Sequence, residues 1–146
     1  MECTVRWTGS SGMSFLAETG SGHILAMDGA VEGGGHNLAP RPMEVMLAGA
    51  GGCTAYDVVV ILRKSRQDIR GCDVTLTSER AEQEPKVFTK IHFHFTLRGR
   101  DLKPNLVERA IKLSHDKYCS ASIMLEKTAV ITHSFEIVDD LTLAAG

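Results

Sequence analysis

Two of the four cysteines in this 146-residue chain lie in patterns that suggest chemistry. Cys53 follows Ala48 to Gly52, a stretch whose three glycines remove side chains that would otherwise cover the thiol. Because a mid-helix glycine costs about 0.5–1 kcal/mol relative to alanine, the pattern indicates close approach of another chain segment or of a substrate. The alternative is an inert thiol buried where small residues pack two helices together.

Cys119 differs because it begins a break in a helical pattern, Cys119 to Ser122. We expect a short helix to follow, with Ser120 or Ser122 as its N-cap. A thiolate at that position would be stabilised by the helix dipole and by His115 and Lys117, which are near in sequence. The alternative is a core cysteine at a helix junction.

The remaining candidates have structural interpretations. Cys3 and Cys72 fall on apolar faces of predicted strands, and we expect both to be inert. His92 and His94 share a strand face, but no second pair has ligand spacing, so a polar strand face is expected rather than a metal site. Asp57 is interpreted as an ion-pair or cap partner within an apolar helix.

Composition limits the class of protein. The content of 43% hydrophobic and 23% charged residues is typical of a globular domain, and a net charge of −2 without a basic cluster predicts no nucleic-acid partner. The acidic start of the chain predicts no secretory signal, so we expect a cytoplasmic protein. The apolar stretch from Val45 to Leu62 includes Asp57 and three glycines, which favours a core helix over a membrane span.

Hydrophobic periodicity predicts an α+β fold with mostly antiparallel sheet, in one domain over residues 1–146. The tail beyond Asp139 has no pattern and is expected to fray. Pro42 marks a helix start, and no phosphate-binding or dinucleotide motif occurs, so no cofactor is predicted. The predicted elements are a strand meander (1–28), a glycine-rich loop (29–41), a central helix (42–65), a hairpin (69–99), a second helix (102–118) and a last strand (129–138).

Three runs, Pro42 to Val58, Asp116 to Ser120 and Ile131 to His133, together resemble the OsmC/Ohr family of osmotically inducible and organic hydroperoxide resistance proteins, and within it the YhfA-like branch. The resemblance in element order covers nearly the whole chain. It implies an OsmC-like fold, with antiparallel sheets packed around two central helices. It also implies an intertwined homodimer with its active sites at the interface.

The resemblance implies roles for both cysteines. Cys53 would attack an organic hydroperoxide or hydrogen peroxide, and Cys119 would resolve the sulfenic acid, in an oxidative stress response. An external thiol or a dithiol such as a lipoyl group would be the reductant, and neither metal, flavin nor haem would be needed. No membrane partner is implied.

The acidic residue of the family's site needs separate treatment. In organic hydroperoxide resistance proteins a glutamate follows the helix-leading proline and pairs with an arginine. Here Met43 takes that place and Glu44 comes one residue later, about 100° further around a helix. Glu44 is therefore a candidate site residue, and its arginine stays unassigned, with Arg6 and Arg41 nearest in sequence.

Two other function classes remain open at the level of sequence. One is a non-catalytic dimer of the same fold that binds a small apolar ligand or responds to oxidation. The other is a hydrolase or acyltransferase that uses Cys53 with His36 or His115.

Overall fold

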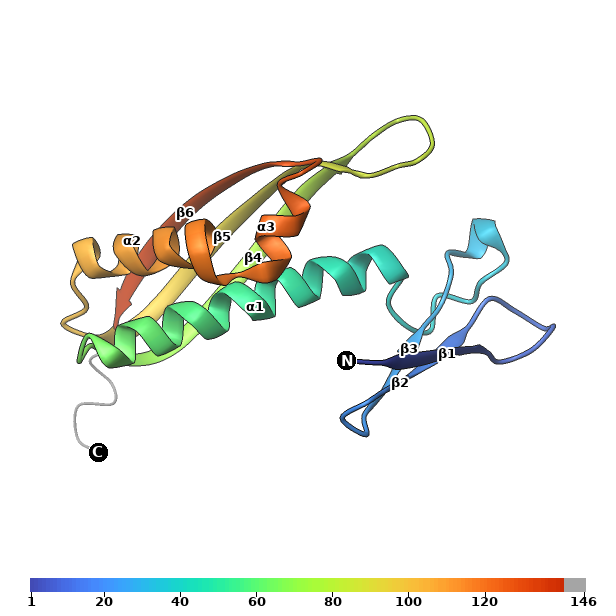
Figure 1. The fold of residues 1–146 in the computed structure, drawn as a ribbon, viewed down its shortest axis with the longest axis horizontal. Coiled ribbons are helices and arrows are strands. Elements are labelled where there is room, and N and C mark those ends of the chain that lie inside the picture. The colour runs from blue at the N-terminus through green and yellow to red at the C-terminus, as the bar shows by residue number, and fades with distance from the viewer. Residues whose placement is uncertain (141–146) are drawn as a thin grey trace. The chain divides into compact units, whose positions relative to one another are not determined.

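Three short strands precede a long helix and a long hairpin in the computed structural model, which describes residues 1–140 (Figure 1). Contacts divide the chain into two units, Met1–Ala48 and Gly49–Gly146, and each is described by itself. The single domain over 1–146 stays a prediction, and the tail expected to fray lies mostly outside the described residues.

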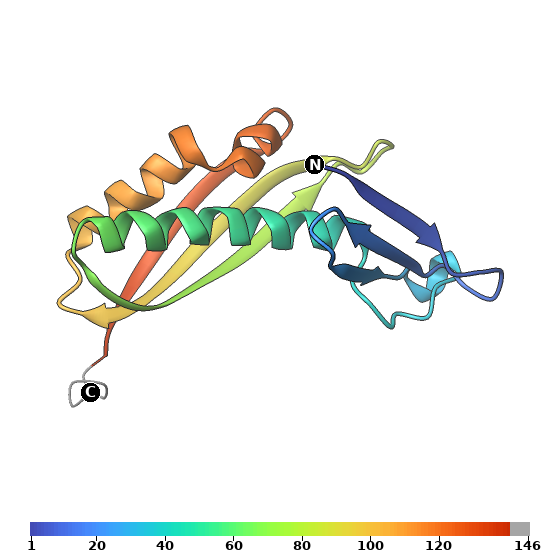
Figure 2. The ribbon, with the colours of Figure 1, turned by 60° about the horizontal axis from the view of Figure 1, so that its bottom comes forward.

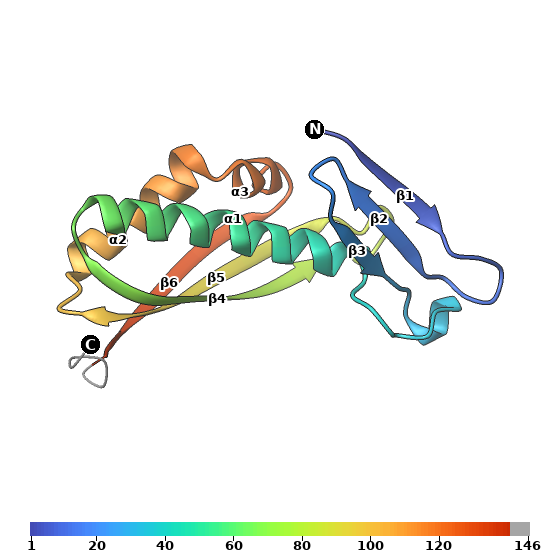
Figure 3. The same cartoon turned by 90° about the horizontal axis from the view of Figure 1, so that it is seen from below.

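The first unit is built on a small antiparallel sheet in the order β1-β2-β3 (Figure 3). Its strands are β1 (Cys3–Trp7), β2 (Phe15–Thr19) and β3 (Ile24–Met27), which matches the predicted meander. Directly paired residues share a face of a sheet, so Val5, Trp7, Ala17 and Leu25 lie on one apolar face. Cys3 belongs to this face, as expected, and it is exposed in the single chain.

The glycine-rich loop after β3 is held by one buried carboxylate. Asp28 accepts backbone N–H bonds from Gly29, His36 and Leu38 at 2.7, 3.2 and 3.1 Å. A Cβ on Gly35 would overlap the backbone of Gly29, so only glycine fits there. The loop, which includes the 3₁₀ turn η1 (Val31–Gly33), is therefore an ordered element of the first unit.

The second unit is a three-stranded sheet covered on one face by helices (Figure 2). Its strands, β4 (Asp68–Arg80), β5 (Phe88–Arg100) and β6 (Val130–Asp139), lie in the order β4-β5-β6. The β4–β5 pair is the predicted hairpin, whereas β6 runs parallel to β5. A parallel pair needs a long crossover. That crossover is formed by α2 (Pro104–Leu113), the π-helical turn η2 (Ser114–Tyr118) and α3 (Ser120–Leu125).

The long helix α1 (Pro42–Lys64) runs beside α2 on the same face of the sheet (Figures 1 and 2). Gly51 is buried, and a Cβ on it would stand 2.8 Å from Leu76 of β4, so this glycine permits close packing of helix on sheet. Gly49 and Gly52 have open space instead. The core between helices and sheet contains Ala50, Val58, Leu62, Ile91, Phe93, Phe95, Leu97, Val107 and Ala110.

By length and composition α1 could cross a membrane: its most apolar window has a mean hydropathy of 1.8, and 28% of that window is buried. Yet the side facing α2 carries Thr54 and Asp57, both joined by hydrogen bonds to Ser114. These hydrogen bonds join α1 to the crossover segment within the second unit, and its interpretation as a core helix stays a prediction.

The outer face of the sheet is polar, as the sequence predicts. His92 bonds Thr132 and Ser134 at 2.6 and 2.7 Å, and His94 bonds Ser134 and Glu136 at 2.7 and 3.2 Å. The hydrogen-bond capacity of these two histidines is thus used by neighbouring side chains of β6.

Candidate active site

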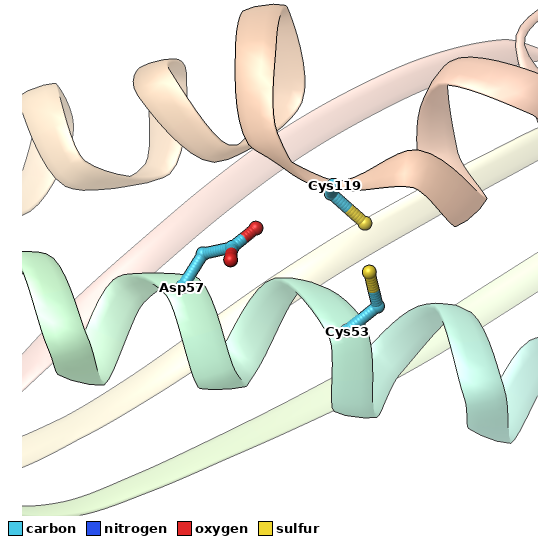
Figure 4. A group of neighbouring side chains, drawn as sticks. All are labelled: Cys53, Asp57 and Cys119. Atoms are coloured by element: carbon cyan, nitrogen blue, oxygen red, sulfur yellow. The ribbon is translucent and has the colours of Figure 1, made fainter.

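The two candidate cysteines lie side by side in the second unit (Figure 4). The sulfur atoms of Cys53 and Cys119 and a carboxylate oxygen of Asp57 all lie within 4.8 Å of one another. Cys53 comes from α1 and Cys119 from the junction of η2 and α3. Residues 66 positions apart in sequence therefore form one cluster of potential nucleophiles and proton acceptors.

The π-helical turn explains how Cys119 reaches α1. Its backbone N–H bonds the carbonyl of Ser114 at 2.8 Å, the i to i+5 pattern that widens a helix. Cys119 is then extended, with φ −78° and ψ 97°, and is itself the N-cap of α3. The expectation that Ser120 or Ser122 is the cap is wrong: the Cys119 sulfur accepts the Ser122 N–H at 3.4 Å.

The two thiols differ in exposure. Cys119 is fully buried, whereas Cys53 is partly exposed. Burial raises the pKa of the Cys119 thiol, the nearby Cys53 thiol raises it further, and hydrogen bonds with Ser122 oppose both effects. Cys119 is therefore a protonated thiol at neutral pH, and Cys53 is the thiol that a molecule from solvent meets first.

Asp57 is held in place by a chain of hydroxyl groups. Ser114 Oγ donates to Asp57 Oδ2 at 2.9 Å, which leaves Thr54 Oγ1, 2.9 Å from Ser114 Oγ, as the donor to Ser114. Thr54 and Ser114 are buried. The interpretation of Asp57 as an ion-pair or cap partner is wrong. The available signal was its spacing: four residues after Cys53, it lies on the same helix face one turn away.

The model of the family described as OsmC-like protein matches residues 34–134. The chain belongs to the OsmC-like family. It is 51% identical over 138 residues to Protein YhfA of Escherichia coli K12, covering 94% of this chain and 98% of that protein. These findings confirm the family named from sequence.

Similar solved structures confirm the α+β fold class. A hypothetical protein from Aquifex aeolicus VF5 is 26% identical, with TM-score 0.82 over 95% of this chain and 96% of that one. An organic hydroperoxide resistance protein from Legionella pneumophila is 17% identical, with TM-score 0.66 over 93% and 97% of the two chains. The second likeness shows the fold alone.

Glu44, the third residue predicted for the active site, is not part of the cysteine cluster. The members of that cluster all come from the second unit. Glu44 lies in the first unit, where its carboxylate is 3.7 Å from Arg41 and both side chains are about half exposed. The other candidate arginine, Arg6, pairs with Glu18 at 3.1 Å.

Neither the remaining cysteines nor the histidines join the cluster within residues 1–140. Burial, with a contribution from Asp73, raises the pKa of Cys72 to about 11, as expected of an inert thiol. His115 packs edge-on against His133 at 4.8 Å and lies 3.4 Å from Glu126. A Cys–His hydrolase arrangement is therefore unsupported in the described chain.

A cavity of about 300 Å³ lies next to Asp57, between α1 and the α2–η2 segment. Most of its lining is apolar or aromatic, and Arg109 and Lys64 add positive charge. The main apolar contributors are Tyr56, Val60, Ile61, Leu113 and Tyr118. The cavity has room for a small organic group beside the cluster.

Proposed function

We propose that this OsmC-like protein reduces hydroperoxides, with Cys53 as the attacking thiol and Cys119 as the resolving thiol. The observation that carries the proposal is the cluster in which both sulfurs and Asp57 lie within 4.8 Å of one another. The difference in exposure supports the assignment of roles, because the partly exposed thiol meets peroxide and the buried one waits behind it. The structural likeness to an organic hydroperoxide resistance protein is consistent with this chemistry.

The reaction takes two steps. The Cys53 thiolate attacks the O–O bond, which breaks; the sulfur becomes a sulfenic acid, and the other oxygen leaves as the alcohol after taking a proton. The Cys119 thiol then attacks the sulfenic sulfur, forming an S–S bond and releasing water. An external thiol or dithiol, itself oxidised to a disulfide, returns both cysteines to the reduced state.

Asp57 suits a role as the proton acceptor for this pair. Its carboxylate lies beside both sulfurs and is oriented by Ser114, so it can take the proton of a thiol that becomes a nucleophile. The adjacent cavity would hold the organic part of the peroxide. Glu44, which the family resemblance offered as the acidic residue, keeps this role as a second proposal.

The partners we propose are a second copy of the chain, a hydroperoxide and a thiol reductant, in the cytoplasm. A second copy is supported by the apolar faces that one chain leaves exposed: Trp7 is 52% and Tyr56 is 72% exposed. An unpartnered surface of this kind is typical of an interface.

The test is intact mass spectrometry without reductant, before and after one equivalent of cumene hydroperoxide. The wild type should lose the mass of two hydrogen atoms as the Cys53–Cys119 disulfide forms. Cys119→Ser should instead retain one added oxygen as a sulfenic acid on Cys53, trapped by dimedone. Cys53→Ser should not react at stoichiometric peroxide, and Cys72→Ser, outside the cluster, should behave as the wild type.

Unchanged wild-type mass under these conditions would contradict the proposal and favour a ligand-binding function of the same fold. A sulfenic acid retained on Cys119 when Cys53 is replaced would reverse the two roles. Turnover that needs Cys53 but not Cys119 would favour a single-thiol mechanism.

A further inference from the structure

The cysteine cluster also has the composition of a metal site. Two sulfur atoms and a carboxylate oxygen converge within 4.8 Å, and none of the three residues is fully exposed. Thiolates and a carboxylate are ligands that Zn²⁺ accepts in proteins. We propose that the reduced protein binds one Zn²⁺ ion per chain through Cys53, Asp57 and Cys119. This proposal does not depend on peroxide reduction.

The geometry requires only small movements. Zinc–sulfur bonds of about 2.3 Å in a tetrahedral site place two sulfurs about 3.8 Å apart. Because the three donor atoms already lie within 4.8 Å, each has to move by at most about 1 Å to reach bonding distance. Rotation of side chains on two adjacent helices supplies a movement of that size.

Hydrogen bonds from neighbouring residues already orient two of the three proposed ligands, Asp57 and Cys119. Ser114 Oγ donates to Oδ2 of Asp57 at 2.9 Å, and Thr54 supports Ser114 from behind. The backbone N–H of Ser122 points to the Cys119 sulfur at 3.4 Å. Hydrogen bonds to ligating carboxylates and thiolates are a regular feature of metal sites, where they orient the ligand and tune its affinity.

Charge gives a second, independent argument. Within residues 1–140 no ion pair reaches Asp57, and the other Asp57 oxygen, Oδ1, has no hydrogen-bond partner there. Asp57 Oδ1 is therefore available as a ligand oxygen for a cation. A dication that releases two thiol protons would balance two of the three negative charges.

With three protein ligands, tetrahedral zinc keeps one open position, as in catalytic rather than structural sites. That position can be taken by water or by a small anionic ligand. A cavity that Asp57, Arg109 and Lys64 line adjoins one of the three ligands and offers positive charge to an anionic ligand.

Metal and disulfide exclude each other at this site, because both use the same two sulfurs. Binding converts two thiols, the Asp57 carboxylate and M²⁺ into a complex of net charge −1 and two protons. A hydroperoxide would oxidise the two thiolates to a disulfide. With two protons it would itself be reduced to the alcohol and water, and the M²⁺ ion would be released. Occupancy of the site would thus report the redox state of the cysteine pair.

The experiment is a titration of fully reduced, chelator-treated protein with Co²⁺, a spectroscopic substitute for Zn²⁺. The expected result is a thiolate-to-cobalt charge-transfer band that saturates at one metal per chain and disappears when Zn²⁺ displaces Co²⁺. Protein oxidised to the Cys53–Cys119 disulfide should give no band. A wild-type titration with no charge-transfer band would overturn the proposal without need of any variant.

Variants identify the ligands. Cys53→Ser and Cys119→Ser should each weaken the band and the affinity, and Asp57→Asn should weaken binding at least about tenfold. Ser114→Ala, which removes the bond that orients Asp57 together with the acceptor of the Thr54 hydroxyl, should cost about 10- to 100-fold in affinity. Cys72→Ser is the matched control and should bind as the wild type. Equal affinity in Asp57→Asn and the wild type, with circular dichroism showing both folded, would exclude Asp57 as a ligand and overturn the three-ligand site.

These assays test the metal-binding proposal and the peroxidase proposal separately, so either can be refuted without the other. Peroxide reactivity is measured on chelator-treated protein, so its loss says nothing of metal affinity. Cobalt binding is measured anaerobically without peroxide, so it survives if Cys53 turns out to be a poor peroxidase.

Discussion

At the scale of single residues, His133 shows how burial controls charge in this fold. It lies on the inner face of β6, with its ring 5.5 Å from Phe93 and 4.8 Å from His115. Burial, followed by repulsion from His115 and His92, lowers its pKa to about 4. His133 is therefore neutral at physiological pH and acts as a packing residue.

His133→Phe should reduce the loss of stability on acidification. The folded pKa of about 4 lies below the unfolded value near 6.5, so the unfolded state binds more protons between these pH values and wild-type stability falls as pH drops through this window. We expect this residue to contribute about 1–2 kcal/mol to the fall between pH 7 and pH 4.5, after allowance for its partial exposure. Phe keeps the ring packing without titrating. Urea midpoints measured across this range test the difference.

The matched control is His23→Gln, because His23 is exposed at a turn of the first unit. It should follow the wild-type pH dependence. If His133→Phe also followed the wild-type curve, His133 would not be a source of the acid sensitivity.

At the scale of elements, the loop from Asp28 to Arg41 depends on one carboxylate. The N–H of Leu38, together with those of Gly29 and His36, lowers the pKa of Asp28, although burial opposes the shift. Because the folded pKa is below the ordinary value of about 3.9, this contribution to stability is present above that pH and is lost as pH falls through the folded pKa.

Asp28→Asn should therefore loosen the first unit at neutral pH and remove its acid-dependent step below about pH 4. Trp7, the single tryptophan, reports on this unit, since its ring N–H bonds Gly12, and Gly12 lies against His36 of the loop. The measurement is tryptophan emission as a function of pH and urea. Glu32→Gln, an exposed change in the same loop, is the control and should keep the wild-type profile. Identical pH profiles for Asp28→Asn and the wild type would contradict this account.

Elements with strong hydrophobic periodicity are predictable from the sequence. The π-helical turn and the direction of the last strand are not. The central helix, predicted at 42–65, is observed at Pro42–Lys64, and the hairpin is equally close. The second helix, predicted to extend to Tyr118, ends at Leu113 and continues as the π-helical turn η2. No residue type in Ser114–Tyr118 marks this change, since π-helical turns occur inside α-helices without a sequence signal of their own. The sequence also does not predict that β6 runs parallel to β5, since side chains alternate with a period of two in parallel and antiparallel strands alike.

Some residues of the candidate site are likewise predictable from the sequence, and others are not. Its two cysteines were found by a run of glycines and a helix break, which are local signals. The place of Asp57 in the site is not predictable from its neighbours in sequence, because Ser114, its hydrogen-bond donor, and Cys119 come from a distant segment. Glu44 followed from family resemblance alone, and its role stays a prediction.

At the scale of the whole molecule, one chain leaves a large apolar surface exposed. Only 28% of the most apolar window of α1 is buried. In the first unit, the apolar face of the small sheet exposes Val5 by 54%, Trp7 by 52% and Leu25 by 39%. A surface of this composition predicts a stable dimer. A partner chain would also bury the sides of α1 that its own sheet leaves exposed, as a helix that is apolar on nearly all sides requires.

Val5→Lys should shift the protein from dimer to monomer, because it places a charge in the centre of the apolar face where a partner would pack. We expect the dimer dissociation constant to rise at least about tenfold, measured by sedimentation velocity over a dilution series. Thr4→Lys is the matched control. Thr4 directly precedes Val5 in β1, is also exposed, and faces the opposite side of the sheet. Trp7, on the same face as Val5, should show red-shifted emission as the dimer dissociates. A wild type that sediments as a monomer at micromolar concentration would refute the dimer, and equal effects of the two variants would place the interface elsewhere.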